Sequence, residues 1–127
     1  AERWARGLLA HPHAWIIEGG SLLGTIRLDR VDLAEKRASL AIGLLRQQDQ
    51  GRGLGTEAVR RVLAYGFDEL GLHRVSARVL ADNVRAIRCY EKCGFVREGR
   101  ERETAFLDGT WHDDLIMGVL SHEFRRE

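Results

Sequence analysis

The sequence predicts a mixed α/β (α+β) fold built as one domain, and three of its features carry that prediction. Gly51, Gly53 and Gly55 form a glycine-rich loop between an apolar strand pattern and a long amphipathic helix pattern. Strand and helix patterns then alternate through the middle of the chain. Near the C-terminus, the tight-turn dipeptide Asp108-Gly109 separates two strand patterns and indicates a hairpin. A chain of 127 residues is long enough for one such core but not for two.

Each expected element follows from a local pattern. Ala38–Leu45 is richly apolar, which is typical of a central strand, whereas His73–Leu80 alternates in the manner of a half-buried strand. The helix after the glycine loop ends at Gly71, and a second helix runs from the N-cap Asn83 to Cys93, before Gly94. The remaining expected elements are a short helix Glu2–Ala10 ended by Pro12, strands Ala14–Glu18 and Ser21–Leu28 joined at Gly19-Gly20, and strands from Phe95 onward and over Thr110–Leu120.

The composition argues against several classes of protein. A net charge of +1, with both signs mixed, provides no basic surface for nucleic acid. No apolar run approaches the roughly 18 residues that a membrane span needs. Cys89 and Cys93 stand four residues apart in a helical pattern and form neither a disulfide framework nor a metal-ligand pattern. We therefore expect no metal, no nucleic-acid partner and no membrane partner, and a reducing, cytoplasmic location.

The glycine loop predicts a phosphate-binding site. Glycines let the backbone approach a ligand closely, and the helix that follows directs unpaired amides and a partial positive charge at it. Two common loops do not match. A mononucleotide P-loop requires lysine before Thr56, where this chain has Gly55, and the dinucleotide pattern G-x-G-x-x-G is absent. What remains is Q-x-x-G-x-G over Gln50–Gly55, for which a purely structural turn stays an alternative.

Three motifs in the same order resemble the GCN5-related N-acetyltransferase (GNAT) superfamily. The first is the loop Gln50–Gly55, which resembles an acyl-CoA pyrophosphate loop. The second is Asn83–Phe95, in which an asparagine opens a helix and a tyrosine follows seven residues later. The third is Phe106–Leu120, which resembles the C-terminal hairpin of the Rim-type (ribosomal-protein N-terminal) and spermidine-type enzymes. The resemblance implies a central sheet splayed at the cofactor site, with helices on both faces.

The resemblance also implies acetyl-CoA as cosubstrate and a set of residues that bind it. The splayed strands Ala38–Leu45 and His73–Leu80 would leave backbone groups free for the pantetheine arm. The residues implied in cofactor binding are Leu44, Leu45, Gln50, Gly51, Arg52, Gly53, Leu54, Gly55, Thr56, Asn83 and Arg88. Three of them have a plainer alternative: Arg52 as a solvated loop cation, Asn83 as a helix cap and Arg88 as a surface arginine.

Tyr90 occupies the position of the family's catalytic acid, which protonates the departing thiolate or donates a hydrogen bond to it. The alternative is a packing aromatic on an amphipathic helix. The general base is not evident, since Arg78 and Ser39 stand where relatives carry glutamate. The remaining candidates lie in or near loops and hairpins, and none stands out: Asp29, Asp32, Glu35, Asp108 and His112.

The expected activity is acetyl transfer from acetyl-CoA to a primary amine by direct attack in a ternary complex. Without an evident base, the less basic α-amine of a protein or peptide N-terminus is the favoured acceptor. A polyamine or aminoglycoside acceptor and a non-catalytic acyl-CoA-binding module stay open as alternatives. Relative to the resembled family, residues 1–127 are expected as a single domain that lacks one N-terminal strand and one helix. The resemblance also suggests a homodimer formed through the C-terminal hairpin.

Overall fold

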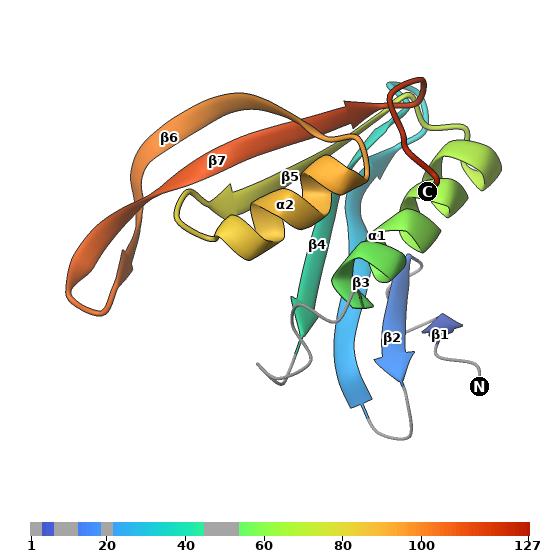
Figure 1. The fold of residues 1–127 in the computed structure, drawn as a ribbon. Helices are drawn as coiled ribbons and strands as arrows, with labels where there is room; N and C mark the ends of the chain where they lie inside the picture. The colour runs from blue at the N-terminus through green and yellow to red at the C-terminus, as the bar shows by residue number, and fades with distance from the viewer. Residues whose placement is uncertain (1–3, 7–12, 19–21, 45–53) are drawn as a thin grey trace.

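The computed structural model describes residues 4–6, 13–18, 22–44 and 54–127. Within these residues, seven strands form one sheet in the order β1-β2-β3-β4-β5-β7-β6 (Figure 1). The pairing of β4 with β5 is parallel and the other pairings are antiparallel, so the sheet is mixed as predicted. The elements are β1 (Trp4–Arg6), β2 (Ala14–Glu18), β3 (Leu22–Asp32), β4 (Arg37–Leu44), α1 (Leu54–Ala64), a π-helical turn η2 (Tyr65–Glu69), β5 (Arg74–Leu80), α2 (Val84–Lys92), β6 (Val96–Leu107) and β7 (Thr110–Leu120).

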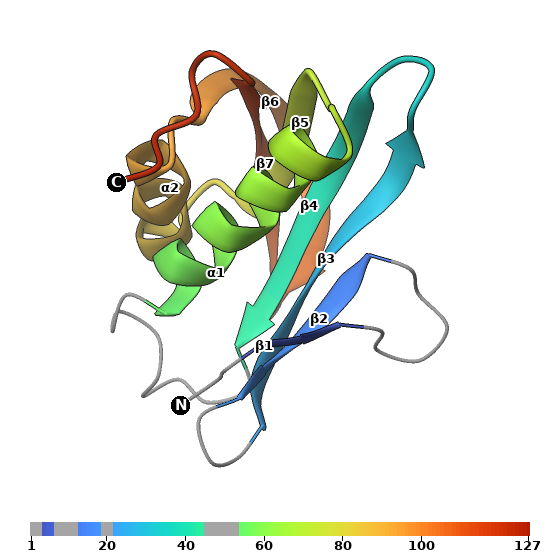
Figure 2. The same cartoon turned by 90° about the vertical axis from the view of Figure 1, so that its right-hand side faces the viewer.

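One face of the sheet forms the core. Alternate side chains of neighbouring strands meet on that face because the register pairs Ala38 with Val75 and Ala77 with Met117. Both described helices, α1 and α2, cover this face (Figure 2). The helix that the resemblance implied for the opposite face is not among the described residues. The largest fully buried side chains of the core are Ile17, Ile26, Leu28, Leu63, Met117, Val59, Val75, Val119 and Cys93.

The expected helix over Glu2–Ala10 is wrong where the structure describes it. Trp4–Arg6 form the short strand β1, which pairs antiparallel with β2. Pairing with the edge of β2 gives the backbone of this segment hydrogen-bond partners. A short isolated helix, by contrast, is only marginally stable in water. The strand expected over Ser21–Leu28 also runs longer, because β3 pairs with β4 as far as Asp32.

The predicted helix ends and hairpin turn are confirmed. Gly71 and Gly94 follow the helices with φ values of +69° and +106°, a left-handed conformation that glycine adopts without strain. At the tip of the β6–β7 hairpin, Asp108 and Gly109 both have positive φ, 50° and 78°. Two successive positive φ values are the mark of the type I′ turn that Asp-Gly favours.

Candidate active site

β4 and β5 part halfway along their length. Their parallel pairing runs from Arg37 opposite Arg74 to Leu40 opposite Ala77 and then stops. β4 continues to Leu44 beside β3, and β5 continues to Leu80 beside β7, so the two strands diverge (Figure 1). Along the diverging parts, the facing edges have no strand partner among the described residues, which leaves backbone donors and acceptors for a ligand. This is the V-shaped opening that the sequence analysis expected.

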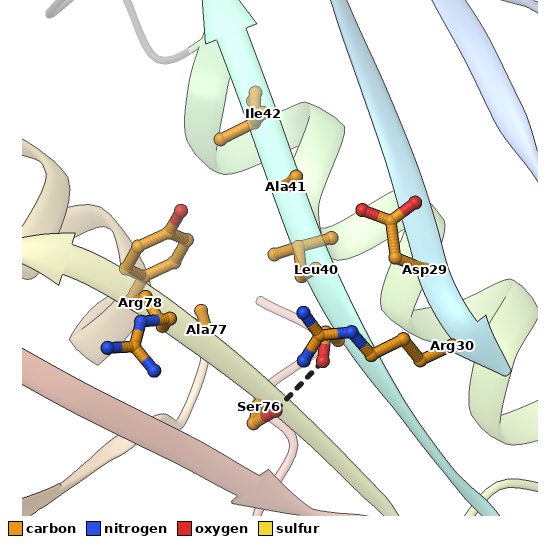
Figure 3. Close-up of a pocket in the computed structure, with 10 residues that line it drawn as sticks. Asp29, Arg30, Leu40, Ala41, Ile42, Ser76, Ala77 and Arg78 are labelled. Atoms are coloured by element: carbon orange, nitrogen blue, oxygen red, sulfur yellow. Dashed lines mark hydrogen bonds between the residues drawn. The ribbon is translucent and has the colours of Figure 1, made fainter. Parts of the chain in front are cut away.

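A cavity of about 270 Å³ lies at this opening (Figure 3). At the closed end of the V, the hydroxyls of Ser39 and Ser76 are 3.4 Å apart and hydrogen-bond across the two strands. The lining combines side chains from both faces of the sheet, so the cavity connects the helix side with the open side. The described residues that line it are Asp29, Arg30, Ser39, Leu40, Ala41, Ile42, Ser76, Ala77, Arg78 and Tyr90.

Tyr90 reaches the cavity from α2. Its side chain is only 5% exposed, and its ring packs against Phe95 with centroids 5.1 Å apart. Burial, with smaller contributions from Cys89 and Cys93, raises the pKa of Tyr90 to about 12. The hydroxyl therefore stays protonated at neutral pH and is available as a donor to an atom in the opening.

The N-terminus of α1 supplies the described part of the expected phosphate site. The helix begins at Leu54, so the first amides, including those of Gly55 and Thr56, have no carbonyl partner within the helix. α2 packs against this end: a side-chain carbon on Gly55 would lie 3.7 Å from the Cys89 sulfur, and the Cys93 thiol donates to the Thr56 carbonyl at 3.9 Å. The rest of the expected loop, Leu45, Gln50, Gly51, Arg52 and Gly53, lies outside the described residues. Its role stays a prediction.

Asn83, Arg88 and Leu44 lie beside the cavity lining and not in it. The Asn83 side chain accepts a hydrogen bond from the Ala86 amide at 3.2 Å and caps α2, as its plainer alternative expected. Arg88 is exposed on α2. Leu44 is the last residue of β4, paired with Gly24 beyond the point where β4 and β5 part. Its predicted backbone contact with the cofactor stays a prediction.

The structure brings one of the five candidate bases to the cavity. Asp29 lines it and accepts from Arg27 Nε at 2.9 and 3.0 Å. Asp32 accepts instead from the Ala34 and Glu35 amides in the β3–β4 turn. Glu35 and Asp108 stand in turns, and His112 lies 3.2 Å from an Asp82 oxygen.

Arg78, at the position where the family resemblance led us to look for a glutamate, lines the cavity and contacts two carboxylates. It forms an ion pair with Glu101 of β6, and its Nε lies 3.5 Å from Asp114 of β7. Sequence reasoning did not find two other lining residues, Arg30 and Ser76. Arg30 sits at an irregularity of β3, and Ser76 faces Ser39 only because of the β4–β5 register, so neither has a local signal.

Two further observations concern metal-binding groups and membrane-spanning helices. No group of three or more His, Cys, Asp or Glu side chains in the described ranges is arranged to hold a metal ion. None of the helices in those ranges is long and apolar enough to cross a membrane.

Comparison with known proteins agrees with the fold. Residues 1–96 match the family model of the acetyltransferase (GNAT) domain. The probable N-acetyltransferase YjcK of Bacillus subtilis is 35% identical over 100 residues, 79% of this chain and 55% of its own length. The putative ribosomal N-acetyltransferase YdaF of the same species is 30% identical over 114 residues, 90% and 62% of the two chains. The spermidine N(1)-acetyltransferase of Vibrio cholerae is 31% identical over 104 residues, 82% and 60%.

Among solved structures, the Vibrio cholerae spermidine N-acetyltransferase in complex with CoA and spermine superposes with a TM-score of 0.78. It is 29% identical, and the match covers 87% of this chain and 66% of that one. This chain spans only 55–62% of the length of the three relatives named above. The match to the family model and the identity to these relatives lead to one conclusion: the chain belongs to the acetyltransferase (GNAT) family.

Proposed function

We propose that the protein transfers an acetyl group from acetyl-CoA to a primary amine held at the β4–β5 opening. The observation that carries the proposal is the parting of these two strands beside a buried tyrosine. Free edges on β4 and β5 suit the amide groups of a pantetheine arm, and the N-terminus of α1 suits its phosphates. The residues present therefore fit acetyl-CoA.

Transfer requires a neutral amine that attacks the thioester carbonyl carbon. The new C–N bond forms as the C–S bond breaks, the amine releases one proton to water, and the departing sulfur carries the negative charge. The Tyr90 hydroxyl donates a hydrogen bond to that sulfur. Because its pKa of about 12 is above the roughly 8.5 of a thiol, its main effect is a hydrogen bond to the developing thiolate. Asp29 lies on the wall where an incoming amine can be oriented.

The favoured acceptor is the α-amine of a peptide or protein N-terminus. Neutralising a lysine-like amine with pKa near 10.4 at pH 7 costs roughly 4.6 kcal/mol, whereas an α-amine near 7.7–8 costs only about 1 kcal/mol. Among the described residues, the one candidate carboxylate at the cavity is Asp29, and it is already engaged by Arg27. One relative is named as a putative ribosomal N-acetyltransferase, and others act on spermidine by name, so a small polyamine is the second candidate.

The test is release of free thiol from acetyl-CoA with a panel of acceptors, with CoA binding measured alongside by calorimetry. The panel contains peptides with free and blocked N-termini, spermidine and an aminoglycoside. Release that requires a free peptide N-terminus supports the proposal, and release with spermidine alone favours the second candidate. CoA binding without release on any amine would leave a non-catalytic acyl-CoA-binding module.

A further inference from the structure

Three charged side chains line the cavity, and two of them are guanidinium groups: Arg30 and Arg78, beside the carboxylate of Asp29. Asp29 is engaged by Arg27, with two contacts of 2.9 and 3.0 Å. Arg78 is engaged by Glu101 and Asp114. For Arg30, by contrast, the described part of the chain provides no ion-pair or hydrogen-bond partner. Arg30 is exposed, so the lining presents a solvated guanidinium that forms no ion pair with the described residues.

The backbone of β3 directs Arg30 towards this place. The register pairs Asp29 with Ser39 and resumes at Asp32 with Arg37, so Arg30 and Val31 form an irregularity between the two pairs. Arg30 has a φ of 51°, a left-handed conformation that disfavours a side chain as long as arginine. Such bulges turn a side chain away from the regular alternation of a strand.

Figure 3 shows the result of this turn. The Arg30 side chain leaves β3 and extends across β4 in this view. Arg30 lines the same cavity as Leu40 and Ser76. Ser39 and Ser76 are small, which leaves room above the closed end of the V. A group bound there would lie on the open face of the sheet, opposite the face that α1 and α2 cover.

We infer that Arg30 selects an acceptor that carries a carboxylate close to its reacting amine; this inference rests on the proposed function. A guanidinium binds a carboxylate through two parallel hydrogen bonds, a geometry that no other side chain supplies. A polyamine, with several positive charges, would meet the Arg30 guanidinium, whereas the carboxylate of Asp29 is already engaged by Arg27, and Glu101 and Asp114 are engaged by Arg78. Two sources share the favoured chemistry: a peptide whose first residue is Asp or Glu, and a free α-amino acid.

The experiment compares acceptors with and without this group. One pair is a peptide beginning with Glu and its counterpart beginning with Gln; the other is a free amino acid and its carboxamide, with kcat/KM expressed per neutral amine because a carboxylate raises the pKa of the amine next to it. For the unaltered protein we expect kcat/KM about tenfold higher on the carboxylate member of at least one pair. The preferred pair identifies the source, and the preference should decline as salt is raised.

Arg30→Gln should lower kcat/KM for the carboxylate acceptor about tenfold, chiefly through KM, and leave the carboxamide acceptor unchanged. Arg37→Gln is the matched control, since Arg37 is an exposed arginine on the neighbouring strand that does not line the cavity. Arg30→Asn is a second variant, because asparagine tolerates a positive φ and keeps the backbone of the bulge. Thermal unfolding of each variant checks that the fold is intact.

Equal rates on both members of each pair in the unaltered protein would overturn the inference, as would equal loss on both in Arg30→Gln. If no amine is acetylated, the proposed function fails, and acceptor binding to the CoA-loaded protein still tests Arg30. Calorimetry that finds the same affinity for Glu-first and Gln-first peptides would then reject it. A Glu preference that Arg30→Gln removes would support it.

Discussion

Tyr90 and Cys89 are neighbours on α2, and their surroundings shift their pKa values in opposite directions. Burial raises the pKa of Tyr90 to about 12. A hydrogen bond with Cys93, helped by Thr56, Lys92 and Arg60 against the effect of burial, lowers the pKa of Cys89 to about 7. One group therefore stays a donor throughout the physiological range, while the other ionises within it.

Replacing Tyr90 with Phe should lower kcat about 100-fold and leave KM for acetyl-CoA unchanged within about twofold. The ring that packs on Phe95 remains, so only the donor is lost. Tyr65→Phe is the matched control: its hydroxyl bonds to His13 at 3.1 Å, and Tyr65 does not line the cavity. Steady-state thiol release measures both variants. An equal kcat for Tyr90→Phe and the unaltered protein would return Tyr90 to a packing role.

Cys89 should react with iodoacetamide at a rate that rises through a midpoint near pH 7, below the pKa of an ordinary thiol. The thiolate is the nucleophile, so the rate follows its fraction. Cys93→Ala removes the largest cause of the lowered pKa, and the midpoint should then move upward. Mass spectrometry of the modified peptide gives the rate at each pH. A midpoint that does not move in Cys93→Ala would contradict this assignment.

At the scale of secondary-structure elements, the glycines that end the two helices have different surroundings. Gly71 has a left-handed backbone in open surroundings: apart from its two chain neighbours, no described residue has a heavy atom within 4 Å of an added side-chain carbon. Gly94 is also left-handed, but its added carbon would overlap the backbone carbonyl of Glu123. There the C-terminal segment packs on the end of α2, with the Arg125 amide donating to the Cys93 carbonyl at 2.9 Å.

Gly71→Ala and Gly94→Ala should therefore differ in stability. We expect Gly71→Ala to cost about 1 kcal/mol, the penalty for a left-handed residue with a side chain. Gly94→Ala should cost about 3 kcal/mol, because the collision is with backbone and forces the C-terminal segment to move. Urea unfolding of the two variants measures the difference in unfolding free energy. Equal losses of unfolding free energy would mean that the C-terminal segment moves away from residue 94 at no cost in stability.

At the scale of the whole molecule, one mixed sheet does two things. Where β4 and β5 pair, the sheet holds the core beneath α1 and α2. Where the two strands part, the sheet forms the opening. The cavity reaches from Tyr90, on the helix side, to Arg30 and Asp29, on the open side. A cofactor that enters among the helices and an acceptor that arrives from the open face would therefore meet at the parting of the strands.

CoA binding should protect amides on the diverging parts of β4 and β5, residues 41–44 and 78–80, from hydrogen exchange. Alternate amides there face the opening and have no partner strand. Residues 105–112 of the β6–β7 hairpin, which pair with each other far along the sheet, are the internal control. At about 100 times its Kd, CoA should also add about 2.7 kcal/mol to the unfolding free energy. Protection spread evenly over both regions would argue against binding at the opening.

The sequence determined much of this protein because the relevant signals are local. The apolar run of β4, the cap at Asn83, the helix ends at Gly71 and Gly94 and the Asp108-Gly109 turn each depend on a few adjacent residues. The spacing from Asn83 to Tyr90 is local as well, and it places the tyrosine on the helix that reaches the cavity.

Only the tertiary structure decided which distant residues share the site. The strand at Trp4–Arg6, the place where β4 and β5 part and the bulge that directs Arg30 into the opening all depend on pairing between separate segments. The same is true of Asp29, which nothing in its neighbourhood distinguished from the other candidate carboxylates. Strand register is set by packing across the whole sheet, so no short stretch of sequence contains it.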